Sequence, residues 1–509
     1  MLRDMSMAAA FGSHPAVAAL MVAFRFSNLL RRLFGEGALH SAFVPQFEAL
    51  RSQDPKRAGK FFRDLSFALM VFLIIFVCLV ECILFACLFF FDFSPENKEI
   101  LYLTVLMFPS IPFICHFGLN NSFLQCEKEY FIGGIAPLAF NVVWIIAVFF
   151  LRNCGINQAM SGLAMSIVIA CCVQYLVTLP RSIQILSGCM GVKFWRSISL
   201  RSRDMKGLMK PLLFGIMGVG ASQVNGALDA IFARYADLEG PAYLWYAIRI
   251  QQLPLALFSL AMSSALLPPL SRAIKENKVD RYLSFLCFSI RYCIEVMLLA
   301  FFGVLVLGPS LVVLLYGRGG FDDVAAYHTT LCLWSYVLGL LPMALIFLLG
   351  AAFYAKGRFL VPMRAAMISV FLNILLNAVM VFFLKMGAES IALATSCSAW
   401  INCYLLIKSL EENVLKELSK LKMQIMKVFG VCFLAALLTW GGGSFLWREQ
   451  VLWMFNEEIF SPFSPFFFEQ VKYFSFQGLC FLGGVFLLGG LFKVSFEFSP
   501  SSSLFKTDV

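Results

Sequence analysis

Residues 25–45 read RFSNLLRRLFGEGALHSAFVP and place five ionisable side chains in an otherwise apolar stretch. These side chains are Arg25, Arg31, Arg32, Glu36 and His40. An ionisable group at membrane depth costs about 2.5 kcal/mol or more unless it faces a protein interior or a watery cavity. If the surrounding chain spans a membrane, this stretch therefore marks a functional site.

The composition of the chain is that of a membrane protein. Its 509 residues have a mean hydropathy of +0.83, include 56 Phe and are only 14% charged, which excludes a water-soluble globule. Apolar runs long enough to cross about 30 Å of hydrocarbon as helices recur along the chain. They do not alternate with polar residues, so a transmembrane barrel is excluded.

We therefore expect an all-α polytopic membrane protein with about fourteen transmembrane helices, the first of them truncated. A short apolar stub at residues 5–11 stands for that first helix. The thirteen full spans are expected at residues 15–36, 62–92, 99–124, 131–152, 158–186, 209–235, 243–269, 283–316, 327–354, 362–385, 388–408, 423–446 and 470–492.

Lys and Arg are distributed unevenly between alternate loops. One set of loops carries 25 of them, including those at residues 51–63, and the opposite set carries 7. Cytoplasmic loops carry the excess of Lys and Arg, so we expect the loop at 51–63 and the C-terminal tail to be cytoplasmic. Orientation accounts for these charges without a nucleic-acid partner.

Two distant segments of the chain resemble each other. AFRFSNL at residues 23–29 resembles AIRIQQL at residues 247–253, and each leads to a serine-alanine pair and a proline. The spacing from arginine to proline is 20 residues in the first copy and 19 in the second, and Pro112 and Pro342 each stand eleven residues before a phenylalanine. The spans concerned are six apart, which predicts a parallel repeat: two bundles with a site between them that is exposed alternately.

The repeat divides the chain into four parts. We expect an N-terminal lobe at residues 1–186, a basic cytoplasmic linker at 187–208, a C-terminal lobe at 209–408, and a final helix pair with a cytoplasmic tail at 409–509.

The arginines of the two repeated spans are expected at similar depth. At 1.5 Å per helical residue, Arg25 lies about 14 Å and Arg249 about 10 Å below the outer ends of their spans, and Arg31 and Arg32 follow about 22 Å down. Guanidinium groups at these depths suit bidentate capture of phosphate oxygens. Alternatively, Arg31 and Arg32 extend to the cytoplasmic surface as orientation signals. Arg291 and Glu295, four residues apart, are expected to form a structural ion pair.

Four polar residues in apolar runs are candidates for a cation site: Asp229, Asn373, Asn377 and Thr395. Their oxygens would suit a small cation such as sodium, and the alternative is ordinary hydrogen bonding between helices. The sequence contains no HExxH, P-loop or GxSxG motif, so we expect no catalytic residues, no metal centre and no enzyme activity.

The run NLLRRLFGEGALHSAFVP at residues 28–45 resembles the signature NLLRR-[ILM]-F-A-E-G-A-F-S-x-A-F-V-P of the lipid II flippase family (MurJ or MviN), within the multidrug/oligosaccharidyl-lipid/polysaccharide exporter superfamily. Further landmarks of that family occur in order along the chain: Pro137 with Asn141, Gln174 with Pro180, Gln223-Val224-Asn225 with Asp229, Tyr246-Ala247-Ile248-Arg249, Gly317-Arg318-Gly319-Gly320-Phe321, and Phe353-Tyr354-Ala355-Lys356-Gly357.

This resemblance implies fourteen helices: two six-helix lobes around a cationic cavity, and a last pair forming a groove for the polyprenyl tail. The implied substrate is lipid II, an undecaprenyl-diphosphate-linked disaccharide-pentapeptide, moved from the cytoplasmic to the outer leaflet for peptidoglycan synthesis. The family's functional arginines fall on Arg3, Arg31 and Arg249, with Arg32 and Glu36 in the same motif. Some members place a sodium site where Asp229, Asn373, Asn377 and Thr395 fall here.

The implied location is the bacterial inner membrane. The expected partners are lipid II, membrane lipids and proteins of peptidoglycan synthesis or division. No cofactor is expected beyond coupling to sodium or to the membrane potential.

The chain departs from the family at three places. An acid early in the second helix aligns with Ala18, and an acid three residues after the second-lobe arginine aligns with Gln252. The usual opening SRxxGFxRD survives only as Arg3-Asp4, so most of the first helix is expected to be missing. Two other classes of function stay open: export of another polyprenyl-linked glycan or of amphipathic drugs, and a non-transporting scaffold of cell-wall synthesis.

Overall fold

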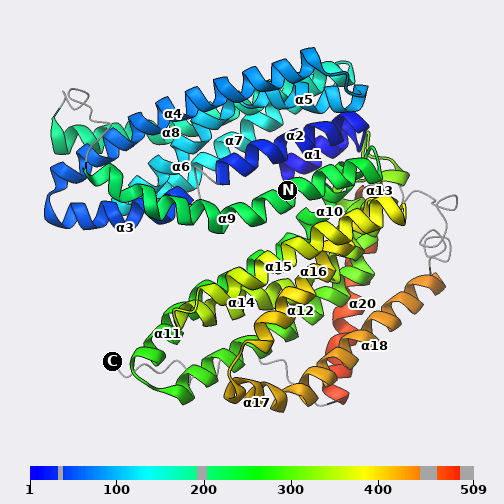
Figure 1. Cartoon of the computed structure of the whole chain (residues 1–509). Helices are drawn as coiled ribbons and strands as arrows, with labels where there is room; N and C mark the ends of the chain where they lie inside the picture. Colours follow the sequence, from blue (N-terminus) through cyan, green and yellow to red (C-terminus); the bar gives the residue numbers. More distant parts are fainter. Residues whose placement is uncertain (33–37, 192–202, 447–466, 493, 495–509) are drawn as a thin grey trace. The chain divides into compact units, whose positions relative to one another are not determined.

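The computed structural model describes residues 1–32, 38–191, 203–446, 467–492 and 494, and every regular element in these ranges is helical. The chain forms two compact units, Met1–Arg234 and Tyr235–Val509, which we describe separately (Figure 1). The expected all-α fold class is confirmed.

The helices of the first unit are α1 (Leu2–Phe11), α2 (Pro15–Arg31), α3 (Ala38–Gln53), α4 (Pro55–Phe90), α5 (Pro95–Met107), α6 (Ser110–Cys126), α7 (Tyr130–Leu151), α8 (Ile156–Met190) and α9 (Arg203–Ala236). Those of the second are α10 (Gly240–Pro254), the π-helical segment η2 (Leu255–Leu260), α11 (Ala261–Lys275), α12 (Val279–Tyr316), α13 (Asp323–Val337), α14 (Leu340–Ala355), α15 (Leu360–Ala378), the π-helical segment η3 (Val379–Phe383), α16 (Glu389–Lys408), α17 (Glu412–Lys420), α18 (Lys422–Leu446) and α20 (Phe467–Leu491).

Each of the thirteen expected spans falls on helix in the described residues. Nine helical segments there are long and apolar enough to cross a membrane, or eleven if the pairs α5–α6 and α13–α14 each count as one span. The expected total of fourteen is therefore not confirmed. The sequence did not predict α3 or α17 as separate helices, because both are short and polar enough to be taken for loops.

Three helices of the first unit begin at a capping side chain followed by proline. At the start of α4, the Asp54 side chain accepts a hydrogen bond from the backbone N–H of Lys56. At the starts of α5 and α2, the Ser94 and His14 side chains accept from backbone N–H groups three and two residues later in the chain. The side chain satisfies an N–H that has no partner within the helix, and proline at the next position has no N–H to satisfy. These starting points are therefore encoded locally.

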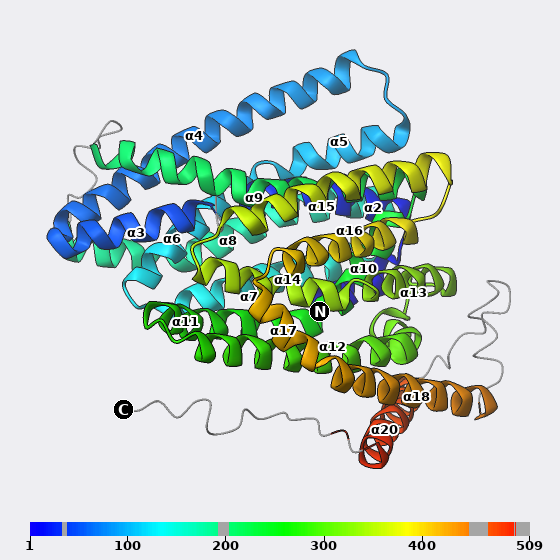
Figure 2. The same ribbon diagram turned by 60° about the horizontal axis from the view of Figure 1, so that its bottom comes forward.

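The helix pairings of the first unit recur in the second unit in the same order. In the first unit α2 packs on α5, α3 on α4, α4 on α6, α6 on α8 and α7 on α8. In the second unit α10 packs on α13, α11 on α12, α12 on α14, α14 on α16 and α15 on α16, and α15 and α16 run side by side in both views (Figures 1 and 2). The repeat expected from the sequence thus extends to the packing of the helices.

Each unit also contains a bent helix pair at the same place in the repeat. The α5–α6 pair bends by 48° and the α13–α14 pair by 42°, just before the prolines Pro112 and Pro342. At the second bend, a Cβ on Gly339 would lie 2.9 Å from the Cα of Ser396 on α16. Only glycine allows so close an approach, so the bend is built around that residue.

The stretch that carries the arginine is described completely only in the second copy. In the first copy α2 (Pro15–Arg31) and α3 (Ala38–Gln53) flank residues 33–37, so the last residues of the expected span at 15–36 lie outside the described residues. In the second copy α10, η2 and α11 run on without a break, and the π-helical turn follows Pro254 directly. Proline lacks the N–H that would continue the α-helical pattern, so a local π-turn keeps the helix continuous.

Helix α9 is attached to the first unit at both ends. Near its start, Asp204 accepts two hydrogen bonds from Arg57 of α4, at 2.7 and 3.0 Å, and its carbonyl accepts one from Gln46 of α3. Near its end, Arg234 donates to the carbonyl of Pro15 at 2.8 Å. The boundaries that we expect from the repeat, at residues 186, 208 and 408, are not tested by these contacts and stay a prediction.

An aromatic cluster fixes α3 next to the motif. Phe43 and Phe47 of α3 pack against Phe62 of α4 and Phe123 of α6, and the rings of the last two are stacked 4.0 Å apart. One turn earlier, His40 hydrogen-bonds to the hydroxyl of Ser122 on α6 at 2.8 Å. This hydrogen bond of His40 therefore links α3 to α6.

A polar clamp joins the last helix pair to the rest of the second unit. Leu298, Phe302 and Val306 of α12 form an apolar cluster with α18 and α20. At the edge of that cluster, Arg291 donates to Glu295 at 3.0 Å, which is the ion pair expected from their spacing. The same carboxylate oxygen accepts a hydrogen bond from Gln424 of α18, also at 3.0 Å. Glu295 therefore links α12 to α18.

The clamp predicts a stability effect. Glu295 is only 3% exposed, so Glu295→Ala withdraws the shared acceptor from two donors inside a helix contact. Breaking a buried pair from one side costs about 3–5 kcal/mol, and we expect thermal unfolding of the purified protein in detergent to move to lower temperature. The double variant Arg291→Met/Glu295→Leu, which removes both charges, should recover most of the loss. An unfolding temperature for Glu295→Ala equal to that of the unsubstituted protein would contradict the clamp.

Candidate functional site

The arginines of the quoted motif lie on the second half of α2. Arg25 and Arg31 are half-buried, and Arg32, just past the helix end, is exposed. The Arg25 Nη1 atom lies 3.5 Å from the position that a Cβ on Gly226 would occupy, so α9 passes close to this guanidinium. Arg31 stands in the last turn of α2, where the helix dipole favours a positive charge. Glu36 lies outside the described residues.

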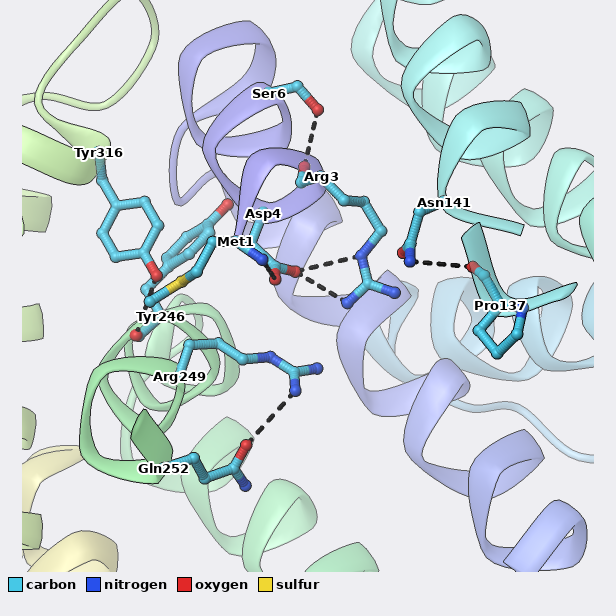
Figure 3. A network of polar contacts seen from close by, with 10 residues as sticks. All are labelled: Met1, Arg3, Asp4, Ser6, Pro137, Asn141, Tyr246, Arg249, Gln252 and Tyr316. Atoms are coloured by element: carbon cyan, nitrogen blue, oxygen red, sulfur yellow. Dashed lines mark hydrogen bonds and ion pairs between the residues drawn. The ribbon is translucent and has the colours of Figure 1, made fainter. Parts of the chain in front are cut away.

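Arg3 is held on α1 by a carboxylate and an aromatic ring. Its Nε and Nη2 atoms donate to Asp4 at 3.3 and 3.0 Å (Figure 3). Its guanidinium carbon lies 4.7 Å from the ring centre of Trp144 on α7, a distance typical of a cation–π contact. Trp144 is 1% exposed, so the arginine rests on a fixed surface.

Arg249 is held on α10 in a similar way. Its guanidinium carbon lies 4.3 Å from the ring centre of Trp245, one turn earlier on the same helix. Its Nη1 atom approaches the Gln252 side-chain oxygen at 3.5 Å, one turn later (Figure 3). The amide carries no charge, so the neighbour that the family resemblance makes an acid does not neutralise Arg249 here.

These two arginines share an arrangement that suits anion binding. An indole ring covers one face of the planar guanidinium and restricts its rotation, whereas the N–H groups of a guanidinium point outward in its plane. Phosphate oxygens bind along such an edge, frequently through two parallel hydrogen bonds. The Trp contact itself occupies none of these N–H donors, and in Arg3 the Nε and Nη2 donors are shared with Asp4.

Three of the four cation-site candidates come together in the second unit. Asn373 of α15 donates to the Thr395 hydroxyl of α16 at 3.3 Å, and Asn377 donates to the Asn373 carbonyl oxygen at 3.0 Å. Both asparagines are almost completely buried, at 1% and 0% exposure. The fourth candidate, Asp229, belongs to the first unit, where its carboxylate accepts a hydrogen bond from Asn225 at 3.3 Å.

The sequence reasoning missed both tryptophans. Trp245 precedes Arg249 by four residues, so helical spacing could have indicated their contact. Trp144 lies on a helix far from Arg3 in sequence, and no local pattern connects them. Ala18 is fully buried in α2, as expected for a small apolar residue in place of the family's acid.

Comparison with known sequences identifies one family. A profile described as lipid II flippase MurJ matches residues 7–460. A protein of Chlamydia muridarum described as a probable lipid II flippase MurJ is 35% identical over 405 residues, covering 79% of this chain and 73% of that protein. The corresponding protein of Vibrio cholerae is 28% identical over 462 residues, covering 88% of this chain and 85% of its own length.

Solved structures share the fold. A structure described as lipid II flippase MurJ in an inward closed conformation matches with a TM-score of 0.74 at 22% identity, covering 96% of this chain and 95% of that one. An inward-facing transporter of the multidrug resistance MATE family, in the MOP superfamily, matches with a TM-score of 0.63 at 15% identity over 84% of this chain and 94% of its own. At these identities the likeness concerns the fold alone.

Proposed function

The chain belongs to the lipid II flippase MurJ family of multi-span inner-membrane transporters, and on that premise we propose that it moves lipid II from the cytoplasmic to the outer leaflet by alternating access. Lipid II is the substrate of that family, which places the chain in peptidoglycan biosynthesis. We assign the diphosphate of lipid II to the arginines Arg3, Arg25, Arg31, Arg32 and Arg249, with Glu36 in the same motif.

The observation that carries this proposal is the pair of tryptophan-backed arginines. A diphosphate offers several anionic oxygens, and Arg3 and Arg249 each present a guanidinium whose face is fixed by an indole ring. Cation pockets for drugs favour acidic and aromatic residues, so the excess of arginine favours an anionic headgroup. A hydrogen bond between a guanidinium and a phosphate contributes about 1.5–3 kcal/mol to the binding free energy. Loss of one such bond should therefore weaken binding of the headgroup measurably.

Alternating access is supported by the repeat. The same helix pairings and a similar bend occur in each unit, as expected for two lobes that move against each other in a transporter with a parallel repeat. The basic loops support the proposed orientation, with a cytoplasmic C-terminus. The turn from α11 to α12, for example, exposes Arg272, Lys275, Lys278 and Arg281.

We also propose that sodium binds at Asn373, Asn377 and Thr395. Amide and hydroxyl oxygens are hard ligands that suit a small cation, and these three residues already contact one another between α15 and α16. Asp229 stays an expectation from the family resemblance. Sodium bound in this way would provide coupling to an ion gradient.

The arginine assignment is tested in cells depleted of their own lipid II flippase. The unsubstituted chain should restore growth and normal lipid II levels, and Arg249→Ala should fail while lipid II accumulates. We expect at least a tenfold loss of transport, since one or two charge-assisted hydrogen bonds are removed. Arg249→Lys, which keeps the charge but loses the planar fork, should be intermediate.

The matched control is Arg152→Ala. Arg152 also stacks on an aromatic ring, at 4.5 Å from the centre of Phe149, but it is exposed at the outer end of α7. The Arg152→Ala variant should restore growth fully. Complete restoration of growth and lipid II levels by Arg249→Ala would overturn the diphosphate assignment, and loss of a surface glycan alone on depletion would favour the other exporter function.

The sodium proposal is tested by thermal unfolding of the purified protein in sodium or potassium chloride at equal ionic strength. A ligand that binds only the folded state raises stability by RT ln(1 + [L]/Kd), about 2.7 kcal/mol at a hundred times Kd. Sodium should therefore raise the unfolding temperature more than potassium does. Asn373→Leu should remove that difference, and Asn402→Leu, on the same α16 as Thr395, should keep it. Equal effects of the two salts on the unsubstituted protein would rule the site out.

A further inference from the structure

Asn141 stands on α7 close to the ring that supports Arg3, the arginine that we assign to the diphosphate in the first unit. It precedes Trp144 by three residues, so the two side chains share a helix face, and the Arg3 guanidinium lies over the Trp144 ring. In the view of Figure 3, the Asn141 amide is drawn on the side of the Arg3 guanidinium away from Asp4. A neutral amide and a cation thus belong to the same face of α7.

One hydrogen bond orients the Asn141 amide and leaves its other polar groups for further hydrogen bonds. Its Nδ2 atom donates to the carbonyl oxygen of Pro137 at 3.0 Å, one turn back on α7. A primary amide has two N–H donors and a carbonyl oxygen with two lone pairs. Among the residues that the structure describes, this single bond is the contact found for the side chain, so a donor and an acceptor remain for a ligand.

A second observation at the same place points to a missing polar partner. The indole N–H of Trp144 is buried, and no hydrogen-bond partner for it occurs in the described part of the chain. The same is true of the hydroxyl of Ser27, on the turn of α2 that follows Phe24, whose ring contacts Trp144 edge-on. A buried donor without a partner costs about 1–3 kcal/mol, which a bridging water would recover.

The chemistry of these groups specifies a class of ligand. The Arg3 guanidinium binds an anionic oxygen. An amide, which has both a donor and an acceptor, hydrogen-bonds to a group that can both accept and donate, such as a sugar hydroxyl or an acetamido group. These two requirements are met side by side where a diphosphate is joined to an amino sugar. We propose that Asn141 recognises the sugar that directly follows the diphosphate of the headgroup, and so separates the loaded carrier from bare polyprenyl diphosphate.

The second unit offers a contrast that favours this assignment. There Arg249 also has a tryptophan on its face and an amide at its edge, but the Gln252 oxygen points back to Arg249 itself at 3.5 Å. The Asn141 amide is instead bonded to the backbone of its own helix. We assign sugar recognition to Asn141, whose amide is oriented by the backbone of its own helix, and this inference rests on the proposed function.

The test compares two ligands on the full-length protein purified in detergent: lipid II and undecaprenyl diphosphate. The variant is Asn141→Ser, since a serine hydroxyl can keep the bond to the carbonyl four residues back while the outward amide is lost. We expect Kd for lipid II to rise about tenfold and Kd for undecaprenyl diphosphate to stay within about twofold. Asn141→Gln, which keeps an amide, should recover most of the lipid II affinity.

Two controls make the outcome decisive. Arg3→Ala should weaken the binding of both ligands. Asn157→Ser, the same exchange at an exposed position at the start of α8, should weaken the binding of neither. Equal weakening of both ligands by Asn141→Ser, or of neither, would overturn the sugar assignment and leave the flippase proposal intact. Failure of the unsubstituted protein to bind either lipid would instead overturn the flippase proposal.

Discussion

The constraint on which this structure depends is the cost of placing guanidinium groups among apolar helices. The chain meets that cost in two ways. Arg63 pairs with Asp64 and Arg291 with Glu295, and in both pairs the carboxylate is almost fully buried, so these arginines serve the packing of helices. Arg249 has an indole ring over one face of its guanidinium and an uncharged amide one turn later on its helix. Arg3 combines both solutions, with Asp4 at one edge and Trp144 under its face. The indole ring over the guanidinium is the feature that Arg3 and Arg249 share.

Much of this architecture could be predicted from the sequence because its signals are local. Apolar runs indicated the positions of the spans, the spacing of Arg291 and Glu295 indicated their ion pair, and the two arginine-to-proline segments indicated the repeat. Contacts between distant residues could not be predicted. Gln424 is 129 residues from Glu295, and Trp144 is still farther from Arg3 in sequence. The α3 helix was missed because it is short and polar enough to be taken for a loop.

The repeat explains how one sequence motif can have unequal roles in its two copies. Both copies place an arginine on the first long helix of a bundle with the same pairings, as a duplicated transporter fold requires. The second copy continues through a π-helical turn after Pro254. Gln252 of α10 contacts Arg249, whereas Asn141 lies on α7, whose counterpart in the repeat is α15, so these two amides are independent features of the two units.

We propose that this chain carries lipid II across a bilayer, and reconstitution tests this activity. The purified full-length protein is placed in vesicles that contain lipid II, and an impermeant enzyme outside the vesicles consumes the lipid II that it can reach. If the protein transports lipid II, consumption continues beyond the fraction initially in the outer leaflet, whereas protein-free vesicles stop at that fraction. If vesicles with folded protein stop at the same fraction as protein-free vesicles, the chain does not transport lipid II.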